Sequence, residues 1–180
     1  MICRRTLGMP RDMALQYDFS GKVALVTGGS QGIGSGVAAA FIDAGAAVVI
    51  TARRNDRLQQ TAAELRNGGG RVLAVPADVT EEDAVRGVVE QCVEEFGRLD
   101  FAINNATDGP MPAPLAEIPS DGFSLGIRTN INGTFYGMKH EIPAMLAWWR
   151  RDHQHGLRCW RQRDQQPRCV RLRQGRDHRT

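Results

Sequence analysis

The sequence predicts an α/β fold built on a doubly wound, parallel β-sheet that is incomplete at its C-terminal side. Short apolar runs rich in β-branched residues alternate with segments whose apolar residues recur every three or four positions. This alternation of strand and helix patterns is typical of such sheets. The pattern ends near residue 147, so the sheet is expected to lack the strands and helices that would complete it.

The strands are predicted by four apolar runs. The first, KVALVT at residues 22–27, ends at a glycine pair and suits a strand that is buried on both faces, as in a parallel sheet. Three further strands are expected at residues 46–51, 71–79 and 99–104.

Helical spacing of apolar residues follows each of these runs. It predicts helices that begin near Gly32, Asn55, Thr80 and Ser120. Thr80 with Asp83 resembles a capping box, with Asp in place of the usual Glu. A Pro-rich loop, residues 107–119, precedes the last helix, which is expected to turn four apolar side chains inward: Phe123, Ile127, Ile131 and Met138.

The first strand runs directly into the glycine-rich stretch TGGSQGIG, residues 27–34. A strand, a glycine turn and a helix in this order form an anion site, because backbone N–H groups and the positive helix N-terminus face the ligand. Gly28 lets the chain turn, Gly32 lets the backbone approach a pyrophosphate, and Gly34 allows helix and strand to pack closely. Glycines alone are often ordinary turn residues, so the flanking strand and helix are what favour a nucleotide site.

Together with three later motifs, this stretch resembles the TGxxxGxG of the short-chain dehydrogenase/reductase family. ADV at 77–79 resembles that family's adenine contact, NNA at 104–106 resembles its NNAG element, and Asn130 matches the Asn of its fourth helix. The resemblance covers residues 19–147. It implies a Rossmann-like fold, a dinucleotide cofactor and hydride transfer between a small alcohol and its carbonyl compound. Thr107 departs from the family, which usually has Gly there, and its side chain could crowd the cofactor.

The resemblance implies cofactor contacts at Gly28, Ser30, Gln31, Gly32, Ile33, Gly34, Arg53, Arg54, Asp78, Val79, Asn105 and Ala106. Asp78 would accept a hydrogen bond from the adenine amine. Ala52 stands where an NAD-preferring site places a carboxylate for the ribose 2′-OH. Arg53 and Arg54 follow it and would attract a 2′-phosphate, so NADP is favoured over NAD. The alternative is that both arginines are solvated residues that open a loop.

The catalytic groups that the resemblance implies are incomplete. The family uses a Tyr as proton donor, a Lys four residues later that lowers the pKa of the phenol, and a Ser that orients the substrate oxygen. This chain has only two Tyr, Tyr17 and Tyr136, and only two Lys, Lys22 and Lys139. Tyr136 and Lys139 come too early in the chain and are expected to be exposed helix residues. Asn130 alone remains as a catalytic candidate, so the chain as written is predicted to be inactive.

The composition changes abruptly after Ala147. Residues 148–180 hold ten of the 23 Lys and Arg residues, all three Trp and three of the 20 acidic residues, so they carry +7 whereas residues 1–147 carry −4. We therefore expect a loose extension over residues 1–17, a partial nucleotide-binding domain over 18–147, and an Arg-rich tail over 148–180 with too few aliphatic residues to fold.

Translation out of register explains the composition of this tail. Read one base forward, the codons for WWRRDHQHG permit Gly-Gly-Gly-Gly-Thr-Ile-Asn-Met-Ala, which resembles the family's glycine turn and fifth strand. The same shift permits Ser at the codon of Leu157, Tyr at that of Val170 and Lys at that of Gln174, in the family's order. These matches indicate a frameshift near Ala147–Arg150. The alternative is a nucleic-acid-binding arm that uses Arg and Trp side chains. Interspersed Asp residues disfavour that alternative.

Other features limit the remaining classes of function. The four Cys are scattered and fit no metal-ligand spacing, so we expect no metal site and a reducing, cytoplasmic location. No segment reaches the roughly 18 apolar residues of a membrane span, and residues 1–17 lack the apolar core of a signal peptide. The expected partners are the dinucleotide and, in the family, a small alcohol or carbonyl substrate. Oligomerisation is expected to be impaired, because much of the family's interface would lie downstream.

Overall fold

The computed structural model describes residues 17–152 of the 180. Within this range four parallel strands form one sheet in the order β3-β2-β1-β4. The strands are β1 Val23–Thr27, β2 Ala47–Ala52, β3 Val72–Pro76 and β4 Phe101–Ile103. The helices are α1 Gly32–Asp43, α2 Asn55–Asn67, α3 Glu82–Phe96, α4 Ser120–Ile127 and α5 Gly133–Asp152. A π-helical turn, Arg128–Asn132, joins α4 to α5 without a break. The predicted parallel α/β fold is confirmed.

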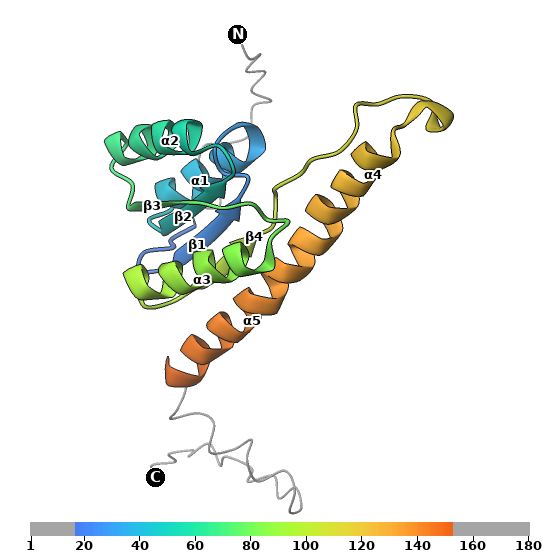
Figure 1. Cartoon of the computed structure of the whole chain (residues 1–180). Helices are drawn as coiled ribbons and strands as arrows, with labels where there is room; N and C mark the ends of the chain where they lie inside the picture. The colour runs from blue at the N-terminus through green and yellow to red at the C-terminus, as the bar shows by residue number, and fades with distance from the viewer. Residues whose placement is uncertain (1–16, 153–180) are drawn as a thin grey trace, which may run out of the picture.

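The sheet is covered on both faces, as Figure 1 shows, with α1 and α2 on one side and α3 and α5 on the other. Alternate residues of each strand point to opposite faces and therefore enter two different clusters. One cluster joins strand residues to α1 and α2: Ala24, Val26, Val48, Ile50, Ala38, Leu58 and Ala62. The other joins them to α3: Val23, Leu25, Val49, Val88, Val89 and Cys92. Burial on both faces explains why the strands are apolar almost throughout.

The last predicted helix is present, but its expected inward side is exposed. Phe123, Ile127, Ile131 and Met138 all have exposed side chains. The helix instead contacts the core further along the chain, where the partly buried Ala144 and Met145 of α5 pack against the α3 cluster. The prediction was wrong because helical spacing identifies an apolar stripe but not the element that covers it. The strands and helices of residues 17–152 leave this stripe largely uncovered.

The predicted boundary at residue 147 falls inside a helix, because α5 continues to Asp152. Trp148 is held by two cations, with the Arg98 guanidinium 3.5 Å and the Lys22 ammonium 5.2 Å from a ring centroid. Contacts of this kind contribute about 0.5–1 kcal/mol where they are solvated. The extension at 1–16 and most of the predicted tail, residues 153–180, lie outside the described residues. Within 17–152 no helix is long and apolar enough to cross a membrane.

Glu141 connects α5 to the end of β4. Its side chain is only 3% exposed, and Asn104 Nδ2 donates a hydrogen bond of 2.9 Å to Oε2. The other carboxylate oxygen, Oε1, has no hydrogen-bond partner among the described residues. Burial raises the pKa of Glu141, and the bond from Asn104 only partly opposes that shift. An ionised Glu141 therefore lowers the stability of the fold.

We expect Glu141→Gln to raise the thermal unfolding midpoint at about pH 8 by a few degrees and to have little effect near pH 4. Because the pKa of the folded state is raised, the stability that the carboxyl contributes is fully present below its unfolded pKa. It is lost as the pH rises through the folded pKa. Circular dichroism melts at both pH values test this, with Glu95→Gln as a control on an exposed α3 residue. A Gln variant less stable than the wild type at the higher pH would contradict the prediction.

Candidate functional site

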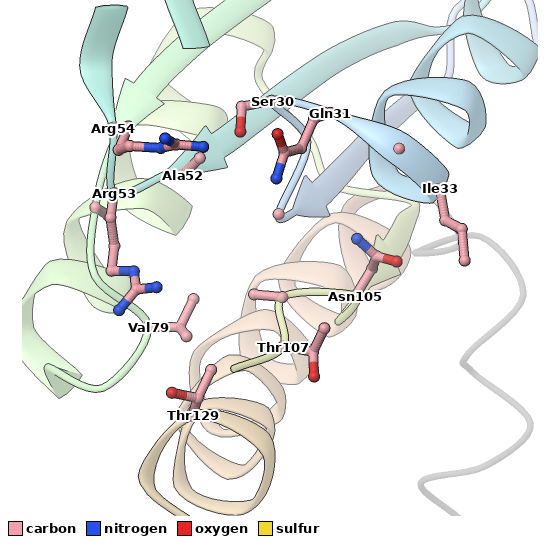
Figure 2. Close-up of a pocket in the computed structure, with 14 residues that line it drawn as sticks. Ser30, Gln31, Ile33, Ala52, Arg53, Arg54, Val79, Asn105, Thr107 and Thr129 are labelled. Carbon is pink, nitrogen blue, oxygen red and sulfur yellow. The ribbon is translucent and has the colours of Figure 1, made fainter. Parts of the chain in front are cut away.

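A pocket of about 590 Å³ opens at the carboxyl ends of the strands. There β1 lies between β2 and β4, so the loops that follow these strands diverge in opposite directions and leave a crevice. Figure 2 shows the lining residues on both sides of it. They are Gly28, Ser30, Gln31, Gly32, Ile33, Ala52, Arg53, Arg54, Ala77, Val79, Asn105, Ala106, Thr107 and Thr129.

The Thr27 hydroxyl ties the two sides of the crevice together at the end of β1. It accepts hydrogen bonds from the backbone N–H groups of Asn105 and Ala106, at 2.9 and 3.0 Å, and it can donate to the Ile103 carbonyl at 3.4 Å. The Asn105 side chain returns the link by donating from Nδ2 to the Thr27 carbonyl at 3.1 Å. The glycine turn is thereby fixed against the loop that follows β4.

The glycine turn itself has the backbone that its sequence suggested. Gly28 and Gly32 have φ of 67° and 59°, in the left-handed region where side chains are strained. Gly34 does not line the pocket: a Cβ there would overlap the Gly28 carbonyl oxygen and lie 2.7 Å from Asn105 Nδ2. Helix α1 begins at Gly32, and no side chain caps it. Its N-terminal N–H groups and the positive end of its dipole are thus available to an anion in the pocket, which Gly32 and Ile33 of this first turn line.

The two arginines after β2 extend in different directions. In Figure 2 the Arg54 side chain points toward Ser30 and Gln31, whereas Arg53 points toward Val79. Arg53 forms an ion pair with Asp108, on the loop that follows β4. Ala52, at the end of β2, also lines the pocket. Among the described residues that line it, none has a carboxylate side chain. The pocket wall is therefore positive at this end.

Asp78 is a site candidate that does not line the pocket, although its neighbours Ala77 and Val79 do. Its Oδ1 atom accepts hydrogen bonds of 2.9 Å from both the N–H and the hydroxyl of Thr80. Thr80 is engaged in this turn, so the capping box predicted for Thr80 does not form, and α3 has no side-chain cap. Sequence reasoning missed Ala77 as a lining residue, although it belongs to the ADV motif.

Thr129, which sequence reasoning also missed, precedes Asn130 in the π-helical turn. Its side chain is 5% exposed and its hydroxyl has no hydrogen-bond partner among the described residues. Asn130 lines a second, adjacent pocket of about 390 Å³ instead. Its Nδ2 atom donates to the backbone carbonyl of Asp108 at 2.9 Å, so the one catalytic candidate fixes the loop that carries the Arg53 partner.

Tyr136 and Lys139 line neither of these two pockets. Lys139 Nζ lies 2.6 Å from Glu82 Oε1 at the start of α3, and this contact is the main reason that the pKa of Glu82 is lowered. The Tyr136 ring packs against Phe135, with 5.8 Å between the ring centroids. Lys139 is exposed and Tyr136 is half-buried, so the expectation of two exposed residues holds only for Lys139. That neither residue takes part in the chemistry stays a prediction.

A family model describing short chain dehydrogenases matches residues 22–156. The chain belongs to the short-chain dehydrogenase family. It is 46% identical over 127 residues to an A-factor type gamma-butyrolactone 1′-reductase of Streptomyces virginiae, covering 70% of this chain and 49% of that protein. It is 40% identical over 134 residues to a 12alpha-hydroxysteroid dehydrogenase of a Clostridium strain, covering 71% and 52%. The chain thus spans about half the length of these curated relatives.

Solved structures of short-chain dehydrogenases and reductases have a similar fold over the matched residues. One from Burkholderia phymatum in complex with NAD matches with a TM-score of 0.70 at 28% identity, covering 73% of this chain and 47% of that one. A 3-ketoacyl-(acyl-carrier-protein) reductase from Brucella melitensis, complexed with NADH, matches with a TM-score of 0.65 at 34% identity, covering 69% and 50%. The pocket described above therefore lies in the part of the chain that shares the nucleotide-binding fold of this family.

We expect Gly34→Ala to destabilise the fold by about 1–3 kcal/mol, because its Cβ overlaps the Gly28 carbonyl and crowds Asn105. Gly36→Ala is the matched control on the same helix: nothing lies within 4 Å of its Cβ position. That substitution should leave stability unchanged or raise it by up to about 1 kcal/mol. Urea unfolding of both variants tests the pair, and equal effects would show that close packing at Gly34 does not matter.

Proposed function

We propose that the described residues form the dinucleotide-binding half of an oxidoreductase that interconverts small alcohols and carbonyl compounds. One observation carries the proposal: the glycine turn and the uncapped N-terminus of α1 open into the same pocket as Arg53 and Arg54. Membership of the short-chain dehydrogenase family supports the class of reaction. Relatives of similar identity are named for lactone, steroid and sugar substrates, so the substrate is proposed only as a class.

The residues of the pocket fit such a cofactor. Backbone N–H groups of the turn from Ser30 to Ile33 would hold the pyrophosphate, because these residues line the pocket at the positive end of α1. Ala77 and Val79 give an apolar wall for an adenine ring. Asn105 and Ala106, fixed by Thr27, would border the middle of the dinucleotide. When bound, the nicotinamide supplies or accepts the hydride.

We propose NADP as the preferred cofactor. The lining carries two guanidinium groups and no carboxylate at the end of β2, which favours a 2′-phosphate over a 2′-hydroxyl. Solved relatives with NAD and NADH show that the fold also accepts the cofactor without that phosphate. In this proposal, the preference for NADP over NAD depends on the side chains of Arg53 and Arg54.

We further propose that this chain binds the dinucleotide without turning over a substrate. Its two Tyr and two Lys are Tyr17, Lys22, Tyr136 and Lys139. Tyr17 and Lys22 both precede β1, and Lys139 is paired with Glu82 outside the pocket. A carbonyl substrate reduced in this pocket would have no phenol to protonate the alkoxide.

Arg54→Ala should weaken NADP⁺ binding by about ten- to a hundredfold and change NAD⁺ binding by less than about twofold, because a charge-assisted hydrogen bond to phosphate contributes about 1.5–3 kcal/mol. Isothermal titration of the full chain with each cofactor measures both affinities. Arg57→Ala is the control, since Arg57 lies in the first turn of α2 but outside the lining of this pocket. Equal weakening of NAD⁺ and NADP⁺ by Arg54→Ala would contradict the proposed preference.

The proposed frameshift is tested by reading the gene across codons 145–180. We expect codons that, moved by one base, encode Tyr across Val170 and Lys across Gln174, with an extra base near Ala147–Arg150. Removing that base should restore a chain that oxidises NADPH with a carbonyl substrate. Codons that cannot encode Tyr and Lys in the shifted frame would contradict the frameshift and favour the nucleic-acid-binding arm.

A further inference from the structure

The ion pair between Arg53 and Asp108 crosses the mouth of the nucleotide pocket. Arg53 follows β2, and Asp108 lies 55 residues later on the loop after β4, so the pair joins opposite sides of the crevice. The two side chains are 49% and 27% exposed. Arg53 lines the nucleotide pocket, whereas Asp108 lines the adjacent pocket beside Asn130.

Asp108 is held in the position from which it reaches Arg53. Its Oδ1 atom accepts a 2.9 Å hydrogen bond from the Gly109 N–H, and Oδ2 faces Arg53. Its backbone carbonyl accepts from Asn130 Nδ2 at 2.9 Å. The Gly109 N–H and then the Arg53 guanidinium keep the pKa of Asp108 below its usual range, so the carboxylate is charged at neutral pH.

This pairing opposes the cofactor preference that the pocket lining favours. A guanidinium already paired with a carboxylate has to exchange that partner, or share it, when it binds a 2′-phosphate. The negative charge of Asp108 would also lie beside the incoming phosphate and repel it. Arg54 forms no ion pair among the described residues, so the two adjacent arginines are not equivalent.

We propose that Asp108 is a specificity-determining residue of the nucleotide site: by pairing with Arg53 it withholds that guanidinium from a 2′-phosphate and lowers the preference for NADP over NAD. This inference rests on the proposed function. Asp108 lies outside the nucleotide pocket and after the NNA motif, so its effect on the cofactor is transmitted through Arg53.

Asp108→Asn tests the assignment, because Asn keeps the size of the side chain and an oxygen for the Gly109 N–H but removes the charge. Titration calorimetry of the full chain with adenosine 2′,5′-bisphosphate and with 5′-AMP gives a ratio of affinities that depends on the 2′-phosphate alone. We expect Asp108→Asn to raise the preference for the bisphosphate about two- to fivefold, the size that a solvated ion pair allows.

Asp121→Asn is the matched control. Asp121 also accepts the N–H of the following residue, Gly122, at 2.9 Å, and it forms no ion pair among the described residues. The Asp121→Asn substitution should leave the ratio of affinities for the bisphosphate and 5′-AMP unchanged. In an Arg53→Ala background the effect of Asp108→Asn should disappear, because the partner through which it acts is absent.

The outcomes separate this inference from the function on which it rests. If both nucleotides bind but Asp108→Asn leaves their ratio unchanged, the role of Asp108 is wrong and the nucleotide site stands. A rise of equal size in Asp121→Asn, or one that persists without Arg53, would also overturn it, because either result indicates a general charge effect. Failure of both nucleotides to bind the wild type and every variant would overturn the proposed function together with the inference.

Discussion

The close approach of the glycine turn to the loop after β4 is the constraint on which the rest of the structure depends. A single hydroxyl, that of Thr27, accepts two backbone N–H groups from Asn105 and Ala106. A Cβ at Gly28 would lie 3.0 Å from the Ala106 Cα, so this turn has little room for any residue but glycine. Because the turn is fixed here, α1 starts at the crevice, and its first residues line the pocket.

The sheet imposes a second constraint, because parallel strands need cover on both faces. On the α3 side, α5 supplies part of that cover with few large apolar contacts. Polar contacts hold it in place: Asn104 to Glu141, Lys139 and His140 to Glu82, and Arg98 to Trp148. The apolar stripe of α4 and α5 is left exposed by the described residues. This helix is therefore oriented by hydrogen bonds and charges as much as by hydrophobic burial.

The charged groups of the site form one connected set. Arg53 is bound by Asp108, and Asn130 holds the Asp108 backbone, so the nucleotide end of the pocket is linked to the helix that carries the catalytic candidate. In the solvated mouth of a crevice each of these contacts is individually weak. Under the proposed function, these contacts would select which anion the pocket accepts, while the backbone of the glycine turn would supply the general affinity for phosphate.

The sequence by itself determined the order and type of the elements, because strand burial and helix amphipathicity are local patterns that residues 22–27 or the α3 stripe carry on their own. It also determined most of the pocket lining, from Gly28 to Ala106, since those motifs follow strands whose carboxyl ends must meet. Only the tertiary structure decided that Phe123 and Ile131 are exposed and that Asp108 reaches Arg53. These depend on packing between segments far apart in the chain, which no local spacing encodes.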